Sequence, residues 1–107
     1  MITAQAIVRR DRSGPDTHAH AEELEKLATG AGFVLQGDRA LVIDSDAGLP
    51  RLLALGTVDA VVVRTLGDVP GWLDYLRTES EVWTLQPRHR WPRRPVAEET
   101  RQLSEHR

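Results

Sequence analysis

Short apolar runs alternate with amphipathic stretches along the chain, and this alternation predicts strands and helices in turn. The strongest run, residues 59–64, contains three consecutive valines with no polar residue between them. Such a run is typical of a parallel strand that is covered on both faces, because an open face favours polar alternation. Residues 6–8 and 81–85 are further runs of strand length.

Helical spacing marks the segments between these runs. Ala21, Leu24, Leu27 and Ala28 recur on one side of a stretch whose other side is charged, and Gly30 or Gly32 provides a C-terminal stop. Shorter helices are expected around Leu52 and Leu53 and around residues 70–76. We therefore expect an α/β fold with three layers, in which helices flank a small, mostly parallel sheet.

The apolar runs 33–35 and 40–43 leave two interpretations open. They form either one bent strand or a hairpin, and Gly37-Asp38 between them favours a turn.

Composition shifts at residue 86, because half of the six prolines lie within residues 87–95, interleaved with arginine. Each proline removes a backbone donor and restricts the preceding residue, which predicts an extended segment. Pro95, the acidic residues after it and the basic residues at the end fit a short terminal helix. We expect an α/β domain over residues 1–86, then a Pro/Arg-rich extended segment and a short helix over residues 87–107.

Composition and charge mainly exclude classes of protein. A chain of 107 residues suffices for one compact domain with a real core. The lack of cysteine excludes disulfides, iron–sulfur clusters and thiolate zinc sites. No apolar run approaches the roughly 20 residues of a membrane helix, and a net charge of −2 argues against a wholly basic nucleic-acid binder. We expect a cytoplasmic protein with no membrane partner, metal or cofactor.

The order and spacing of these elements resemble the catalytic domain of the serine recombinases (resolvases and invertases) over residues 4 to about 85. The resemblance is carried by residues 6–8, 24–28, 32–34, 48–53 and 59–63. It implies a resolvase-like fold. In that family, a serine just after the first strand attacks a DNA phosphodiester, while several arginines neutralise the phosphate.

The residues that the family uses for strand cleavage are not matched here. Family members carry Tyr-x-Arg-x-Ser where residues 8–12 read Val-Arg-Arg-Asp-Arg, so Arg12 replaces the nucleophile. Ser13 is one position late, and a slip of one residue in an extended segment turns a side chain to the opposite face. Two arginines of the family are missing from residues 66–71, where Asp68 stands instead. We expect no enzymatic activity, and expect a binding or regulatory module.

Arg9, Arg10 and Arg12 follow the first strand, and Arg39 could join them. Open α/β sheets bind ligands at the carboxyl ends of their strands, so these arginines are a candidate anion site. The alternative is that they pair with Asp11 or Asp16. A metal site at Asp16, His18, His20 and Glu22 is disfavoured, because such residues at a helix entry usually cap it in solvent.

Aromatic residues suggest a protein interface. Trp72, Tyr75 and Trp83 are three of five aromatic residues, and with Leu76 they could crowd one edge of a small sheet. Trp and Tyr are favoured as interface anchors, which suggests self-association or a protein partner. The alternative is ordinary core packing.

The last candidate is a basic segment around Trp91 that contains Arg88, Arg90, Arg93 and Arg94. Arginines can contact phosphates and a Trp ring can stack on a base, but the same residues can engage an acidic protein surface or local carboxylates. Association with a protein is the preferred function. A nucleic-acid-binding accessory protein is the alternative, and an enzyme acting on a phosphorylated substrate lacks an evident nucleophile or base.

Overall fold

The computed structural model describes residues 2–53 and 58–94. In chain order, the strands and helices are β1 (Thr3–Arg9), α1 (Arg10–Ser13), α2 (Thr17–Gly30), β2 (Val34–Leu35), β3 (Leu41–Ile43), α3 (Leu49–Leu53), β4 (Ala60–Val63), α4 (Leu73–Leu76), β5 (Glu81–Leu85) and β6 (Arg88–Trp91). Short 3₁₀ turns join some of them: η1 (Gly14–Asp16), η2 (Gln36–Asp38), η3 (Asp46–Gly48) and η4 (Leu66–Asp68). The fold is α/β, as the alternation of patterns predicts.

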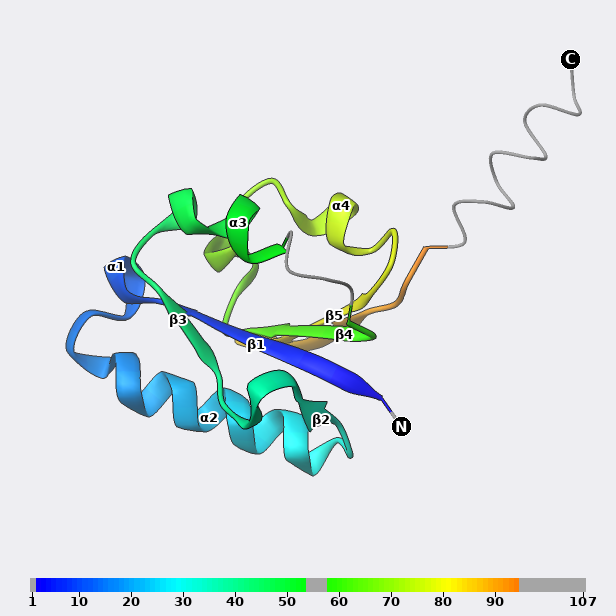
Figure 1. Cartoon of the computed structure of the whole chain (residues 1–107), viewed down its shortest axis with the longest axis horizontal. Coiled ribbons are helices and arrows are strands. Elements are labelled where there is room, and N and C mark those ends of the chain that lie inside the picture. The colour runs from blue at the N-terminus through cyan, green and yellow to red at the C-terminus, as the bar shows by residue number, and fades with distance from the viewer. Residues whose placement is uncertain (1, 54–57, 95–107) are drawn as a thin grey trace, which may run out of the picture.

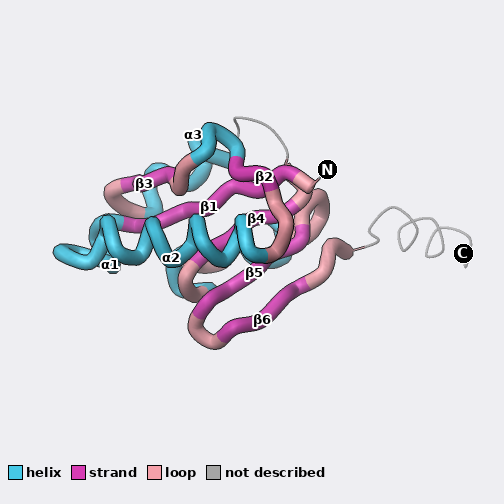
Figure 2. The backbone as a smooth tube through the Cα atoms, turned by 90° about the horizontal axis from the view of Figure 1, so that it is seen from below, coloured by secondary structure: helices cyan, strands magenta, loops and turns pink. Residues whose placement is uncertain are grey.

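The described strands form one six-stranded, mostly parallel sheet in the order β2-β1-β4-β5-β6, with β3 also paired to β1. Figure 2 shows this order, with β6 at one edge and β2 at the other. The pairs β1–β4 and β4–β5 are parallel, and β6 runs antiparallel to β5. A mostly parallel sheet is therefore confirmed.

The runs 33–35 and 40–43 contribute one interrupted edge strand and not a hairpin. Both β2 and β3 pair in parallel with β1, β2 near its start and β3 near its end. Between them, Gly37 and Asp38 both have positive φ, 75° and 66°. Two consecutive residues in the left-handed region break the extended backbone, so the strand resumes only at Leu41.

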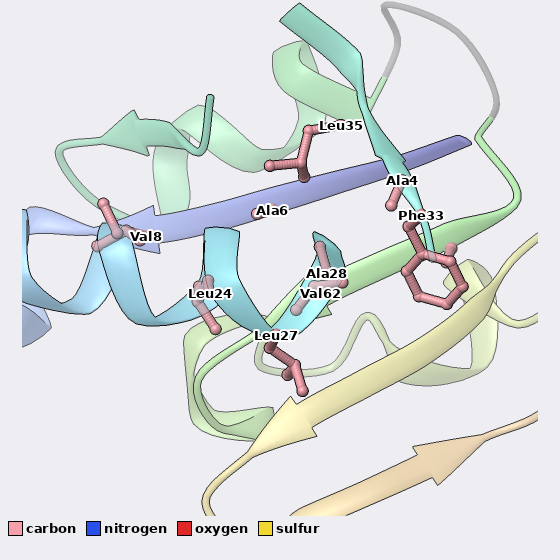
Figure 3. Close-up of a cluster of buried hydrophobic side chains, with 11 residues drawn as sticks. Ala4, Ala6, Val8, Leu24, Leu27, Ala28, Phe33, Leu35 and Val62 are labelled. Carbon is pink, nitrogen blue, oxygen red and sulfur yellow. The ribbon is translucent and has the colours of Figure 1, made fainter. Parts of the chain in front are cut away.

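Helices cover both faces of the sheet, with α2 on one side and α3 and α4 on the other (Figure 1). Side chains of β1 alternate between the layers. On the α2 side, the core contains Ala4, Ala6 and Val8 of β1 together with Leu24 of the helix (Figure 3). On the opposite side, Ile7 packs with Leu49 and Leu76. Val61, Val62 and Val63 are at most 2% exposed, which confirms that the valine run is covered on both faces.

Residues 88–91 also belong to the sheet, so it continues past the domain boundary expected at residue 86. The extended conformation was predicted from the prolines. However, Pro87 and Pro92 flank β6 and leave four residues between them free to pair with β5. The expected terminal helix lies outside the described residues.

The path of the chain creates a switch point between β1 and β4. From β1 the chain passes through α2 to β2 on one side, and later through α3 to β4 on the other side of β1. Open α/β sheets bind ligands at the carboxyl ends of the strands at such a point. Here the segments at the carboxyl ends of the two strands are residues 9–13 and 64–68, which we call the β1–β4 switch point. Within the described ranges, no helix has the length and apolar character needed to span a membrane.

Candidate functional site

Arg9 is the last residue of β1, and its side chain is buried at the switch point. Its Nε and Nη2 donate to the two carboxylate oxygens of Asp11 at 3.0 and 2.6 Å, and Nη1 donates to the carbonyl of Gly67 at 3.5 Å. The hydrogen bond with Asp11 raises the pKa of Arg9 and lowers the pKa of the Asp11 carboxyl. The charge of Arg9 is therefore balanced within the chain.

Asp68 forms the corresponding contact from the β4 side. Its Oδ1 accepts a hydrogen bond from Arg12 Nε at 2.7 Å, and its Oδ2 accepts one from the backbone N–H of Thr65 at 3.2 Å. Asp68 is 6% exposed, whereas the side chain of Arg12 is 47% exposed. Gly67 lets Arg12 lie close to the η4 backbone, because a Cβ there would come within 2.8 Å of Arg12 Nη2. The pair thus joins the segments after β1 and β4.

Arg10 and Arg12 point in different directions. Arg9, Arg10 and Arg12 therefore do not form the single cluster that the sequence suggests. The reason is geometric: α1 is a single helical turn, and residues two apart in a helix differ by about 200° in direction. Arg10 Nε lies 3.8 Å from Asp44 Oδ1, and both side chains are exposed. Together with His18 and Arg39, Arg10 lines a groove of about 500 Å³ between α2 and β3.

Sequence reasoning missed two polar contacts at this end of the sheet. Ser13 Oγ lies 2.7 Å from Nδ1 of His20, across the η1 turn. Arg64 directly follows the valine run, and its Nη2 donates to Gln86 Oε1 at 3.0 Å. Its place at the carboxyl end of β4 was a usable signal, whereas the Ser13–His20 contact depends on the shape of the turn.

The four residues expected to crowd one edge of the sheet do not form one surface. Trp83 faces the α2 layer, where its ring meets Phe33 edge to face at 5.4 Å. Trp72 and Tyr75 lie on the α4 side, with their rings 5.4 Å apart, and Leu76 is part of the core there. Alternate residues of β5 face opposite layers, which directs Trp83 away from α4. Of the four, Tyr75 alone is largely exposed, at 60%.

The β6 strand also separates its arginines from its rings. Arg88 and Arg90 lie opposite Leu85 and Trp83, on the α2 face, whereas His89 and Trp91 lie on the other face. Trp91 is half-buried against the core beneath α4, and its ring centroid is 4.2 Å from that of His89. A base stacked on Trp91 would therefore lie on the face opposite to Arg88 and Arg90.

Carboxylates lie against two of the basic residues in this segment. Arg90 Nη2 donates to Glu81 Oε2 at 2.8 Å, and Arg94 Nη1 lies 3.8 Å from Asp74 Oδ1. Burial raises the pKa of Glu81, but the hydrogen bonds from Arg90 and Trp83 outweigh it, so this pKa falls below its usual value. Arg88, Arg90 and Arg93 are exposed.

The two histidines near the start of α2 have different neighbours. His18 Nε2 lies 3.0 Å from Glu22 Oε1, whereas His20 contacts Ser13. Among the residues that the structure describes, no group of three or more His, Asp and Glu side chains could hold a metal ion.

Comparisons with protein-family models, with curated proteins and with solved structures give no match to this chain.

Proposed function

We propose that this chain is a non-catalytic binding or regulatory module of resolvase-like fold, which acts in the cytoplasm by associating with itself or with a protein partner. One observation carries the proposal. At the β1–β4 switch point, where an open α/β domain binds its ligand, Asp11 and Asp68 of the same chain hold the guanidinium groups of Arg9 and Arg12.

A phosphate at this point would have to displace those carboxylates. Asp11 engages two nitrogens of Arg9, and Asp68 accepts hydrogen bonds from both Arg12 and the Thr65 backbone. Without displacement, the two negative carboxylates repel the incoming phosphate, and the developing charge of a cleavage reaction gains no free donor. The position that the resemblance assigns to the nucleophile is occupied by Arg12, one member of these ion pairs. Association through another surface leaves the pairs intact.

The alternative, a nucleic-acid-binding accessory protein, is supported by the three exposed arginines of the basic segment, Arg88, Arg90 and Arg93. It is less favoured because Arg90 and Arg94 lie against carboxylates and because Arg88 and Arg90 lie on the face opposite to Trp91. Steep salt dependence requires many simultaneous phosphate contacts, and this arrangement reduces their number.

Two measurements test the proposal on the full chain. Incubation with supercoiled and linear DNA, followed by denaturing electrophoresis, should show no covalent protein–DNA adduct for the unaltered chain or for Arg12→Ser. Sedimentation velocity from micromolar to hundreds of micromolar should show self-association, or the immobilised chain should retain a protein that then binds as a purified component. An adduct with the unaltered chain, or a monomer that retains no protein, overturns the proposal.

A further inference from the structure

We propose that the chain self-associates through the outer edge of β3, which binds the same edge of a second copy in antiparallel register about Val42. This inference rests on the proposed function and names the surface and the partner for it.

Exposed apolar residues gather along this edge of the sheet. Among the described residues, the exposed large hydrophobic side chains are Ile2 at 46%, Val34 at 41%, Val42 at 39% and Tyr75. Val34 and Val42 belong to the edge strands β2 and β3, and Ile2 lies beside β2 just before β1, where its carbonyl accepts a hydrogen bond from the Val34 N–H at 2.9 Å. An edge lined by exposed β-branched residues favours the addition of another strand.

The outer side of β3 is open. Its inner side pairs with β1, and no other described strand pairs with it. Val42 lines two grooves, the groove of about 500 Å³ towards α2 and another of about 690 Å³ towards α3, where Arg51 and Leu52 lie. The two grooves therefore meet at Val42, and an added strand would reach the backbone of β3 there.

Alternation places one set of β3 side chains on the α2 side of the sheet. Val42 pairs with Val8, which faces α2, and Ala40 packs against the same core. Asp44 follows β3 in a bend and also lines the groove towards α3, but its Oδ1 lies 3.8 Å from Nε of Arg10, which lines the groove on the α2 side. Glu25 Oε2 accepts a hydrogen bond from the Ala40 N–H at 2.8 Å and lies 3.4 Å from Arg39 Nε, so the Arg39 guanidinium is on this face too.

The charges at the two ends of β3 select a second copy in antiparallel orientation. With Val42 opposite Val42, Ala40 of one copy lies opposite Asp44 of the other, which brings the adjacent Arg39 near that almost fully exposed carboxylate. Within each chain, Arg39 also lies against Glu25 and Asp44 lies near Arg10. Two-fold symmetry repeats the contact, so each dimer contains it twice. A parallel pairing in register would place Arg39 against Arg39 and Asp44 against Asp44, which repel each other.

The other edge of the sheet is not self-complementary. Arg88, His89 and Arg90 are exposed along β6, so two copies of this edge would bring like charges together. The β3 edge is therefore the one that fits a second copy.

A charge exchange tests the register. Arg39→Asp alone places two carboxylates at each contact, and Asp44→Arg alone places two guanidinium groups there. A mixed dimer of the two variants restores opposite charges at both contacts. We expect each variant alone to raise the dimer dissociation constant about tenfold or more. An equimolar mixture of the two should recover the wild-type sedimentation coefficient.

Two further variants separate charge, apolar and folding effects. Val42→Lys should also weaken the dimer, because it places two ammonium groups at the two-fold axis. Arg88→Asp is the matched control, since it makes the same kind of change at an exposed arginine of the opposite edge, and it should leave the dissociation constant unchanged. Far-UV circular dichroism and a urea titration check that every variant is folded.

The outcomes distinguish this inference from the proposed function. A wild-type dimer that is insensitive to Arg39→Asp, Asp44→Arg and Val42→Lys overturns the β3 surface and leaves self-association standing. A mixture that does not recover association overturns the register. A wild-type chain that is monomeric throughout overturns the inference, while the proposed function then depends on whether the immobilised chain binds a purified protein partner.

Discussion

Replacing Asp68 with alanine should destabilise the domain well beyond an ordinary surface substitution. Asp68 is buried, and its carboxylate accepts hydrogen bonds from Arg12 and from the backbone N–H of Thr65. The change removes both acceptors at once. If the switch point is occupied by ion pairs that hold the loops after β1 and β4 together, the free energy of unfolding should fall.

The magnitude follows from the two lost contacts. Leaving the Thr65 N–H without an acceptor costs about 1–3 kcal/mol. The Arg12 pair adds about 0.5–1 kcal/mol, discounted because the guanidinium is half exposed and water can solvate it afterwards. The sum is about 1.5–4 kcal/mol, a large part of a typical stability of roughly 5–15 kcal/mol. Asp68→Asn keeps a carbonyl oxygen for Thr65 and should cost about 1 kcal/mol.

Urea titration followed by tryptophan fluorescence measures these values, with Asp74→Ala as a control at an exposed aspartate of α4. Asp68→Ala within about 0.5 kcal/mol of the wild type would refute the reasoning, because surface substitutions fall in that range. Equal losses for Asp68→Ala and Asp68→Asn would show that the charge matters and the Thr65 hydrogen bond does not.

Two further predictions concern charge. The pKa of Glu81 lies below its usual value of 4.5, so its contribution to stability is present above that pH and is lost as the pH falls through the lowered pKa. Urea titrations at successively lower pH should therefore show a smaller acid loss for Glu81→Gln than for the wild type, and equal losses contradict the assignment. Fluorescence anisotropy with a single-stranded oligonucleotide should give a log–log salt slope well below the value of about 3 expected for four phosphate contacts. The reason is that Arg90 and Arg94 lie against Glu81 and Asp74, and a slope near that value favours the nucleic-acid alternative.

The sheet could be predicted from the sequence because burial leaves a local pattern. Three valines in succession require cover on both faces, and Val61, Val62 and Val63 are buried as that pattern predicts. The edge strand could not be decided in the same way. Gly37-Asp38 indicates a change of direction, but a hairpin turn and a break within one strand both use left-handed residues there. The choice depends on whether the two runs pair with each other or each pairs with β1, which is a tertiary property.

The candidate site was only partly predictable for a related reason. The position of the arginines at the carboxyl end of β1 follows from strand direction alone. Their partners do not, because Arg12 and Asp68 are 56 residues apart and meet only when β1 and β4 become neighbours. Local geometry also intervenes, since the single turn of α1 directs Arg10 and Arg12 to opposite sides of β1.

The same ion pairs bear on where association can occur. A ligand at the β1–β4 switch point would exchange existing hydrogen bonds of Arg9 and Arg12 for new ones, with little net gain. A strand added beside β3 would instead pair backbone groups on a side with no described partner strand and cover Val42, without breaking the Arg12–Asp68 contact. The short length of β3, three residues, limits the number of backbone hydrogen bonds. Arg39 and Asp44 have Glu25 and Arg10 of their own chain beside them, so new contacts between copies add little, but like charges introduced there would outweigh these few backbone bonds. Exchanging the two charges is therefore the most sensitive test of the surface.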